Sequence, residues 1–224
     1  MAADHTVRSF DRELEQLKMA ILELGELTLT QFTDSMRSFT AGDITLSARI
    51  MEKDNDVDEC ARALDNRTVR LLALRQPVAQ DLRSIIAALR ISIDLERIAD
   101  YAFNVAERTL HLPPNPPSKP VATILTMGQV TQEMLHEVME AYRRHDASMA
   151  ARIWSRDQEV DAVYSTLLVE LRAFMIRDPQ RIDACTDLLF ITKSIERVGD
   201  HIKNIAEHIY YAVHGTQLHE AEAM

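Results

Sequence analysis

The sequence predicts an all-α protein made of two tandem three-helix bundles, with six long antiparallel helices and an internal duplication. Leu, Ala, Glu, Arg, Met and Ile dominate the 224 residues, and most of these residue types favour helix. The chain has only five glycines and 5% aromatic residues, whereas strand-rich folds need glycine turns and aromatic cross-strand pairs. Apolar residues recur at three- and four-residue spacing along six stretches, which is typical of amphipathic helices.

Aspartates and prolines separate these six stretches. Asp43 and Asp146 can cap helices, and Pro77, Pro120 and Pro179 suit a first helical turn, where a missing N–H costs nothing. The connecting loops are short, so neighbouring helices must be antiparallel. We expect helices over residues 6–41, 43–75, 77–111, 120–144, 146–177 and 179–213.

The chain repeats two motifs in the same order. DITLSARIMEKDNDVDECA at 43–61 matches DASMAARIWSRDQEVDAVY at 146–164, and E-R-x-x-D-x-x-x-N-x-A-E occurs at 96–107 and again at 196–207. This order favours a duplicated three-helix unit over chance similarity within one continuous six-helix bundle. The predicted division is a first bundle over 1–112, a proline-rich linker over 113–120, a second bundle over 121–214 and a tail over 215–224.

Charge and cysteine content limit the class of protein. The formal net charge of −10 opposes direct binding to nucleic-acid phosphates. Cys60 and Cys185 are isolated, as expected for reduced, buried thiols in a cytosolic protein. The N-terminus lacks the apolar segment of a signal peptide and no 18-residue apolar run occurs, so we expect a cytoplasmic protein with no membrane span.

The repeated acids lie on one side of their helices, away from the apolar stripe. With about 100° of turn per residue, Glu96, Asp100 and Glu107 fall within about 40° of one another. Leu95 and Ile98 lie on the opposite side, and residues 196–207 repeat the pattern. Like charges four residues apart repel by about 0.2–0.5 kcal/mol, so helix formation alone does not explain the stripe.

The preceding helix of each half adds an acidic pair, D-x-x-x-D, at the edge of its own apolar stripe. Each half can therefore bring four carboxylates to one surface spot, which is the ligand set of a hard metal ion such as Mg²⁺, Mn²⁺ or iron. The candidate metal ligands are Glu96, Asp100, Glu196, Asp200, Asp54, Asp58, Asp157 and Asp161.

Two other interpretations of these acids remain open. Arg97 precedes Asp100 by three residues, and Lys203 follows Asp200 by three and precedes Glu207 by four, so the acids could form surface ion pairs. They could also form an acidic docking face for a basic partner. Enzymatic chemistry has less support, because the sequence contains no glycine-rich phosphate loop, G-x-S-x-G or H-E-x-x-H. We therefore expect a protein that is not an enzyme.

Four segments resemble the PhoU family of phosphate-signalling and phosphate-transport regulators. They are LALRQPVAQDLRSIIAALRISIDLERIADYAFNVAE (72–107), ARIMEKDNDVDE (48–59), ARIWSRDQEVDA (151–162) and SIERVGDHIKNIAE (194–207). The resemblance implies a cytoplasmic homodimer that couples a phosphate ABC transporter ATPase to a sensor histidine kinase and restrains uptake when phosphate is plentiful. It also implies metal binding at the eight carboxylates named above, with Asn104 and Asn204 continuing the stripe.

The first copy departs from the family pattern. The second copy keeps ERVGDH, but the first reads ERIADY, with Ala99 in place of glycine and Tyr101 in place of histidine. If the histidine serves the metal site, the two halves differ. The rival hypothesis is a helical interaction scaffold with an acidic docking face and no phosphate role, and a metal-dependent hydrolase is a weaker third.

Overall fold

The computed structural model describes the backbone of residues 2–218 and the side chains of residues 9–218. This part of the chain forms six α-helices and one short 3-10 helix, which confirms the all-α prediction. The elements are α1 (Ala2–Ala41), α2 (Ile44–Arg75), α3 (Ala79–His111), α4 (Ser118–Arg144), α5 (Ala147–Arg177), η1 (Pro179–Arg181) and α6 (Ile182–His214).

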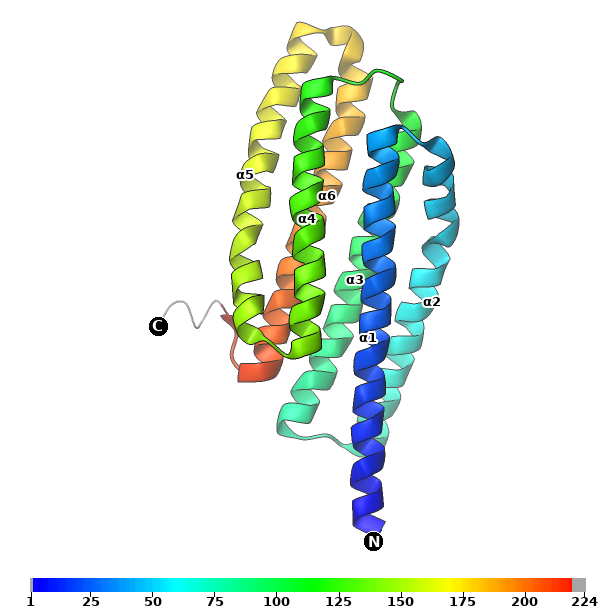
Figure 1. The fold of residues 1–224 in the computed structure, drawn as a ribbon, viewed down its shortest axis with the longest axis vertical. Helices are drawn as coiled ribbons and strands as arrows, with labels where there is room; N and C mark the ends of the chain where they lie inside the picture. Colours follow the sequence, from blue (N-terminus) through cyan, green and yellow to red (C-terminus); the bar gives the residue numbers. More distant parts are fainter. Residues whose placement is uncertain (1, 219–224) are drawn as a thin grey trace.

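The two halves form three-helix bundles that lie side by side (Figure 1). Helices α1, α2 and α3 pack together, as do α4, α5 and α6, and the halves meet where α1 packs on α4 and α3 packs on α6. One cluster of buried apolar residues draws members from all six helices, among them Phe32, Ile98, Met134 and Ile195. The duplicated units therefore share a continuous core.

Side-chain caps begin the second helix of each half, as predicted. The Asp43 carboxylate accepts a hydrogen bond from the Leu46 backbone N–H at 3.0 Å, and Asp146 accepts one from Met149 at 2.9 Å. These bonds satisfy backbone donors that have no partner within the helix. The matching caps show that the duplication extends to the turns between helices.

Prolines were a poorer guide to where helices begin. Pro77 lies before α3, whose first residue, Ala79, has a φ of 48°, and Pro179 opens the 3-10 helix that precedes α6. A proline is compatible with a first turn but does not oblige the helix to begin there. Pro120 does lie in the first turn of α4, although that helix already begins at Ser118, inside the predicted linker.

The predicted tail over 215–224 is only partly described. Gly215 ends α6 with a φ of 75° and Leu218 is buried, while residues 219–224 lie outside the described part of the chain. Cys60 and Cys185 are free thiols, and Cys185 is buried as expected, whereas Cys60 is only half-buried.

Glycines bring α1 and α4 together in a reciprocal way. Met139 of α4 covers Gly25 of α1, and Met36 of α1 covers Gly128 of α4. A Cβ atom at Gly25 would come within 2.3 Å of the Met139 Cε, and one at Gly128 within 2.3 Å of the Met36 Cε. The exchange of roles between the halves indicates that the duplicated units pack about an approximate two-fold axis.

We expect Gly128→Val to lower the free energy of unfolding by about 1–3 kcal/mol, because the new side chain would displace Met36 from the contact between α1 and α4. Urea denaturation of the purified protein measures the change. Gln129→Val introduces the same side chain at the neighbouring exposed position and should change stability by no more than about 0.5 kcal/mol. Equal effects of the two substitutions would show that the contact is not tight.

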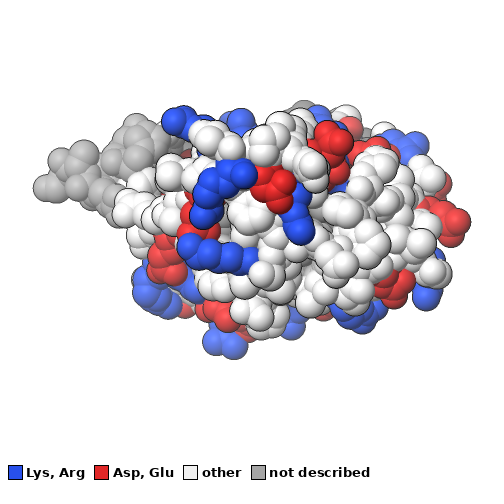
Figure 2. All heavy atoms as spheres, turned by 90° about the horizontal axis from the view of Figure 1, so that it is seen from above, with Lys and Arg blue, Asp and Glu red and all other residues white. Residues whose placement is uncertain are grey.

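The end of the molecule that carries the α1–α2, α3–α4 and α5–α6 connections has charges of both signs. Figure 2 shows acidic and basic side chains interspersed there, with uncharged surface between them. This end is therefore not the single-sign acidic face that a basic partner would require. Within the described residues, no helix has both the length and the apolar character needed to cross a membrane.

Candidate functional site: two carboxylate clusters

Helices α2 and α3 bring together the four predicted acids of the first half, Asp54, Asp58, Glu96 and Asp100, here called the first cluster. Burial raises the pKa of Asp54, and the charges of Asp58 and Asp100 raise it further against a hydrogen bond from Gln31. Burial also raises the pKa of Glu96, and the other three carboxylates act in the same direction. The four side chains are thus close enough to repel one another.

Helices α5 and α6 carry the second cluster, formed by Asp157, Asp161, Glu196 and Asp200. Asp157 is 2% exposed, whereas Asp161 is exposed to solvent. Burial raises the pKa of Asp157, and Lys203 opposes that rise. The sequence-predicted pairing of D-x-x-x-D with E-x-x-x-D is therefore present in both halves, but its environment differs between them.

One arginine serves each cluster in the same way. The Arg97 guanidinium lies 3.0 Å from the Asp100 carboxylate and 3.7 Å from that of Glu96. In the second half, Arg197 lies 3.0 Å from Asp200 and 3.9 Å from Glu196. The ion pair that the spacing suggested between Arg97 and Asp100 is therefore present, and Arg197 repeats it at Asp200.

Two lysines distinguish the second cluster. The Lys203 ammonium lies 3.1 Å from the Oδ2 atom of Asp157, which belongs to the neighbouring helix α5. The spacing had instead suggested ion pairs with Asp200 and Glu207 on its own helix. The Lys193 ammonium lies 2.5 Å from the Oε2 atom of Glu196. Phe103 and Ile93 occupy the corresponding positions of the first half. Among the described residues, ion pairs join the first cluster to Arg97 alone.

The first cluster borders an open hollow of about 360 Å³ between α2 and α3, lined in part by Asp58, Glu96 and Ile93. Its carboxylate oxygens are the donors that a hard cation prefers. Within the described part of the chain, however, no three or more His, Cys, Asp or Glu side chains stand in an arrangement that could hold a metal ion. The donor set of the first cluster therefore fits a cation, but its side chains would have to turn to coordinate one.

The glycine of the second copy makes room for Asp157. The Oδ1 atom of Asp157 is buried without a hydrogen-bond partner among the described residues, and a Cβ atom at Gly199 would lie 3.2 Å from it. In the first half, Gln31 of α1 donates to Asp54 at 2.8 Å and to the Ala99 carbonyl at 3.4 Å. The two halves thus hold this aspartate differently, since Asp54 is half-buried and bonded to Gln31, whereas Asp157 is buried beside Gly199.

The histidine that the first copy lacks lies at the contact between the halves. The Nδ1 atom of His201 is 2.8 Å from the Oδ1 atom of Asp94 on α3, and its ring lies 5.7 Å from that of Tyr101. Tyr101 and His201 therefore meet each other across the α3–α6 interface. In this structure, the replacement of histidine by tyrosine at position 101 therefore affects the contact between the two bundles.

Asp94 is the centre of a polar network that we did not predict from the sequence. It is 7% exposed and also accepts hydrogen bonds from His208 and Asn204, at 3.2 and 3.3 Å. Burial alone would raise the pKa of Asp94, but the hydrogen bonds from His201 and His208 lower it below its ordinary value. The one available signal was an aspartate placed beside the apolar stripe of its helix, with Ser194 at the matching position.

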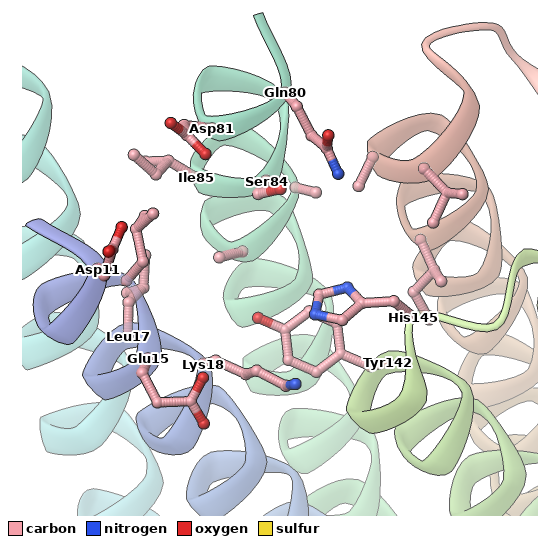
Figure 3. A pocket seen from close by; sticks show the side chains of 16 residues that line it. Asp11, Glu15, Leu17, Lys18, Gln80, Asp81, Ser84, Ile85, Tyr142 and His145 are labelled. Atoms are coloured by element: carbon pink, nitrogen blue, oxygen red, sulfur yellow. The ribbon is translucent and has the colours of Figure 1, made fainter. Parts of the chain in front are cut away.

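A cavity of about 430 Å³ opens where α1, α3, α4 and α6 meet. Figure 3 shows Tyr142 of α4 and His145, the residue that follows α4, reaching into it, with charged side chains of α1 opposite. Burial lowers the pKa of His145, and the positive charge of Lys18 lowers it further. None of the eight predicted acids lines this cavity, and its lining from four helices left no local pattern in the sequence.

Comparison with known proteins decides the family. The model of the PhoU domain matches residues 21–109 and 124–209, once in each half. The chain belongs to the PhoU family. The curated relative in Zymomonas mobilis named "Phosphate-specific transport system accessory protein PhoU homolog" is 39% identical over 216 residues, which cover 96% of this chain and 91% of the relative. A homologue of the same name in Caulobacter vibrioides is also 39% identical, covering 96% and 94%.

Solved PhoU structures share the whole fold. The crystal structure of PhoU from Pseudomonas aeruginosa superposes with a TM-score of 0.88 at 35% identity, covering 92% of this chain and all of that one. The phosphate transport system regulatory protein PhoU from Streptococcus pneumoniae gives a TM-score of 0.87 at 30% identity, covering 93% and 98%. The duplicated three-helix architecture is thus a property that the PhoU relatives share.

Proposed function

We propose that this protein is an accessory regulator of phosphate transport that acts by binding other proteins and not by catalysis. The observation that carries the proposal is the match of both halves to the PhoU domain, together with relatives named as phosphate-specific transport accessory proteins over 96% of the chain. The absence of catalytic motifs from the sequence supports a binding role.

The proposed partners are the ATPase of a phosphate ABC transporter and a sensor histidine kinase, both met in the cytoplasm by a homodimer of this chain. The protein would restrain uptake and keep phosphate-starvation genes off when phosphate is plentiful. The net charge of −10 supports control through proteins, because a strongly acidic chain is a poor direct ligand of DNA.

The proposal includes a hard cation, Mg²⁺, Mn²⁺ or iron, at the first cluster. Asp54 and Asp58 of α2 and Glu96 and Asp100 of α3 would supply its oxygen ligands. A bound cation would neutralise carboxylates that otherwise repel one another, and would thereby join α2 to α3. The open hollow beside the cluster gives solvent access.

Deletion of the gene tests the regulatory role. We expect phosphate-starvation genes to be expressed in phosphate-rich medium in the deletion strain, and to be silent again when the gene is restored. A reporter fused to a phosphate-starvation promoter measures this. Unchanged reporter activity would favour the rival hypothesis of an interaction scaffold with no phosphate role. Affinity capture from phosphate-replete cells should recover the transporter ATPase or the kinase.

We expect the double substitution Glu96→Ala and Asp100→Ala to reduce the metal content of protein purified without chelator. These residues supply half of the first cluster, and elemental analysis measures the loss. Glu133→Ala with His136→Ala is the matched control, since it removes an isolated E-x-x-H pair outside the cluster. Metal content that is the same in both variants and in the wild type would contradict the assignment.

A further inference from the structure

We infer that Lys203 and Lys193 are the built-in counter-cations of the second cluster, so that binding of an external metal ion is confined to the first. This inference rests on the proposed cation site at Asp54, Asp58, Glu96 and Asp100. It replaces the expectation, implied by the family resemblance, that the carboxylates of both halves bind metal.

Lys203 is held in place from two sides. Its ammonium lies 3.1 Å from the Asp157 carboxylate and 5.1 Å from the centre of the Trp154 ring, within the range of a cation–π contact. The Trp154 indole N–H in turn donates to Glu207 at 2.7 Å, which fixes the ring. The ammonium therefore stands beside the most buried carboxylate of the cluster, where a bound cation would otherwise neutralise it.

Lys193 makes the same kind of contacts at Glu196. Its ammonium lies 2.5 Å from the Glu196 carboxylate and 5.0 Å from the centre of the Tyr164 ring. The Glu196 side chain is 12% exposed, whereas that of Glu96 in the first half is 29% exposed. Each of the two inner carboxylates of the second cluster is thus paired with a lysine that also lies over an aromatic ring.

The first half lacks all four members of this arrangement. Phe103 and Ile93 stand in place of the two lysines, and Met51 and Ala61 stand in place of Trp154 and Tyr164. Ile93 is 52% exposed and lines the hollow beside the first cluster. Both lysines and both aromatic rings are absent from the first half. The two halves therefore differ in the whole arrangement and not at one position alone.

Charge balance separates the two clusters. Among the described residues, the ion pairs of the second cluster involve Arg197, Lys193 and Lys203. A metal ion entering there would have to displace an ammonium group from a buried carboxylate or bind next to it, and like charges at short range repel strongly. The Oδ1 atom of Asp157 has no hydrogen-bond partner among the described residues, but it is buried from solvent beside Gly199 and so offers no open entry for an ion.

Manganese titration of the full-length protein tests the inference, with isothermal titration calorimetry for stoichiometry and the melting temperature as a second readout. We expect Asp54→Asn to abolish the binding seen in the wild type, and Asp157→Asn to leave it intact. Lys203→Met should add a second binding event and make the melting temperature rise with manganese. Lys119→Met, which removes an exposed lysine from an ion pair with Glu170, is the matched control and should behave as wild type.

The reciprocal variant, Phe103→Lys, gives a decision even if Lys203→Met fails to fold. The new ammonium should reach Asp54 as Lys203 reaches Asp157, and manganese binding should be lost. Equal loss of binding in Asp54→Asn and Asp157→Asn, or unchanged binding in Phe103→Lys, would overturn the inference while leaving metal binding itself intact. No manganese binding in the wild type, with binding gained in Lys203→Met, would instead refute the proposed cation site and support the role of the lysine.

Discussion

Lys203→Met is expected to lower the free energy of unfolding by about 2–4 kcal/mol in the presence of a chelator, because it leaves the Asp157 carboxylate buried without a counter-charge. Lys203 is 34% exposed, so solvent screening keeps the loss below that of a fully buried pair. The double variant Asp157→Leu with Lys203→Met should recover most of the stability, since replacing both members of a buried pair by apolar residues is often neutral. Urea denaturation of the two single variants and the double variant gives the coupling energy.

An exposed ion pair sets the scale for that result. Lys119→Met breaks a pair with Glu170 in which the lysine is 80% exposed, and should cost no more than about 1 kcal/mol. If Lys203→Met were no more destabilising than Lys119→Met, Asp157 would not depend on Lys203 for its charge balance.

Asp94→Ala is expected to lower the free energy of unfolding by about 2–4 kcal/mol, because it leaves His201, His208 and Asn204 without their common acceptor at the buried contact between the halves. The loss should be accompanied by weaker association of α3 with α6. Hydrogen exchange of the amides in these two helices reports that change alongside the global stability.

A second ion pair across the same interface is the control. Arg108 lies 3.5 Å from Asp187, and it also lies over the Phe190 ring at 4.4 Å. Asp187→Asn should cost no more than about 1 kcal/mol, since the Arg108 side chain is 35% exposed and keeps its aromatic contact. A loss for Asp94→Ala as small as that for Asp187→Asn would mean that the histidine network adds little to the joining of the bundles.

Local pattern and repetition were sufficient to predict the architecture. Apolar spacing identified the helices, and the caps at Asp43 and Asp146 set where α2 and α5 begin. The starts of α3 and α6 were less accurate, because Pro77 and Pro179 precede helices without beginning them. The shared core was also beyond local reasoning, since it depends on how one bundle packs against the other.

The sequence predicted which helices bring the acids of each cluster together, but not which other side chains contact those acids. The spacing correctly placed acids of α2 beside acids of α3, and those of α5 beside those of α6. It could not show that Lys203 reaches Asp157, because a long side chain can select a partner on another helix. It likewise missed Asp94, whose partners lie more than a hundred residues away along the chain.

A difference in metal binding between the two clusters would affect how the protein regulates its proposed partners. If only the first half exchanges a metal ion with solvent, the join between α2 and α3 responds to the supply of that ion, while the join between α5 and α6 is permanent. One duplicated unit would then provide a fixed scaffold and the other a cation-dependent surface for the proposed partners.

Anomalous X-ray diffraction from crystals of the wild-type protein equilibrated with Mn²⁺ would show whether only the first cluster binds metal, since it locates each bound ion. We expect a manganese peak between α2 and α3, within coordination distance of carboxylates of the first cluster, and no peak between α5 and α6, where Lys203 remains on Asp157. Peaks of equal height in both halves, or a peak in the second half alone, would contradict this expectation.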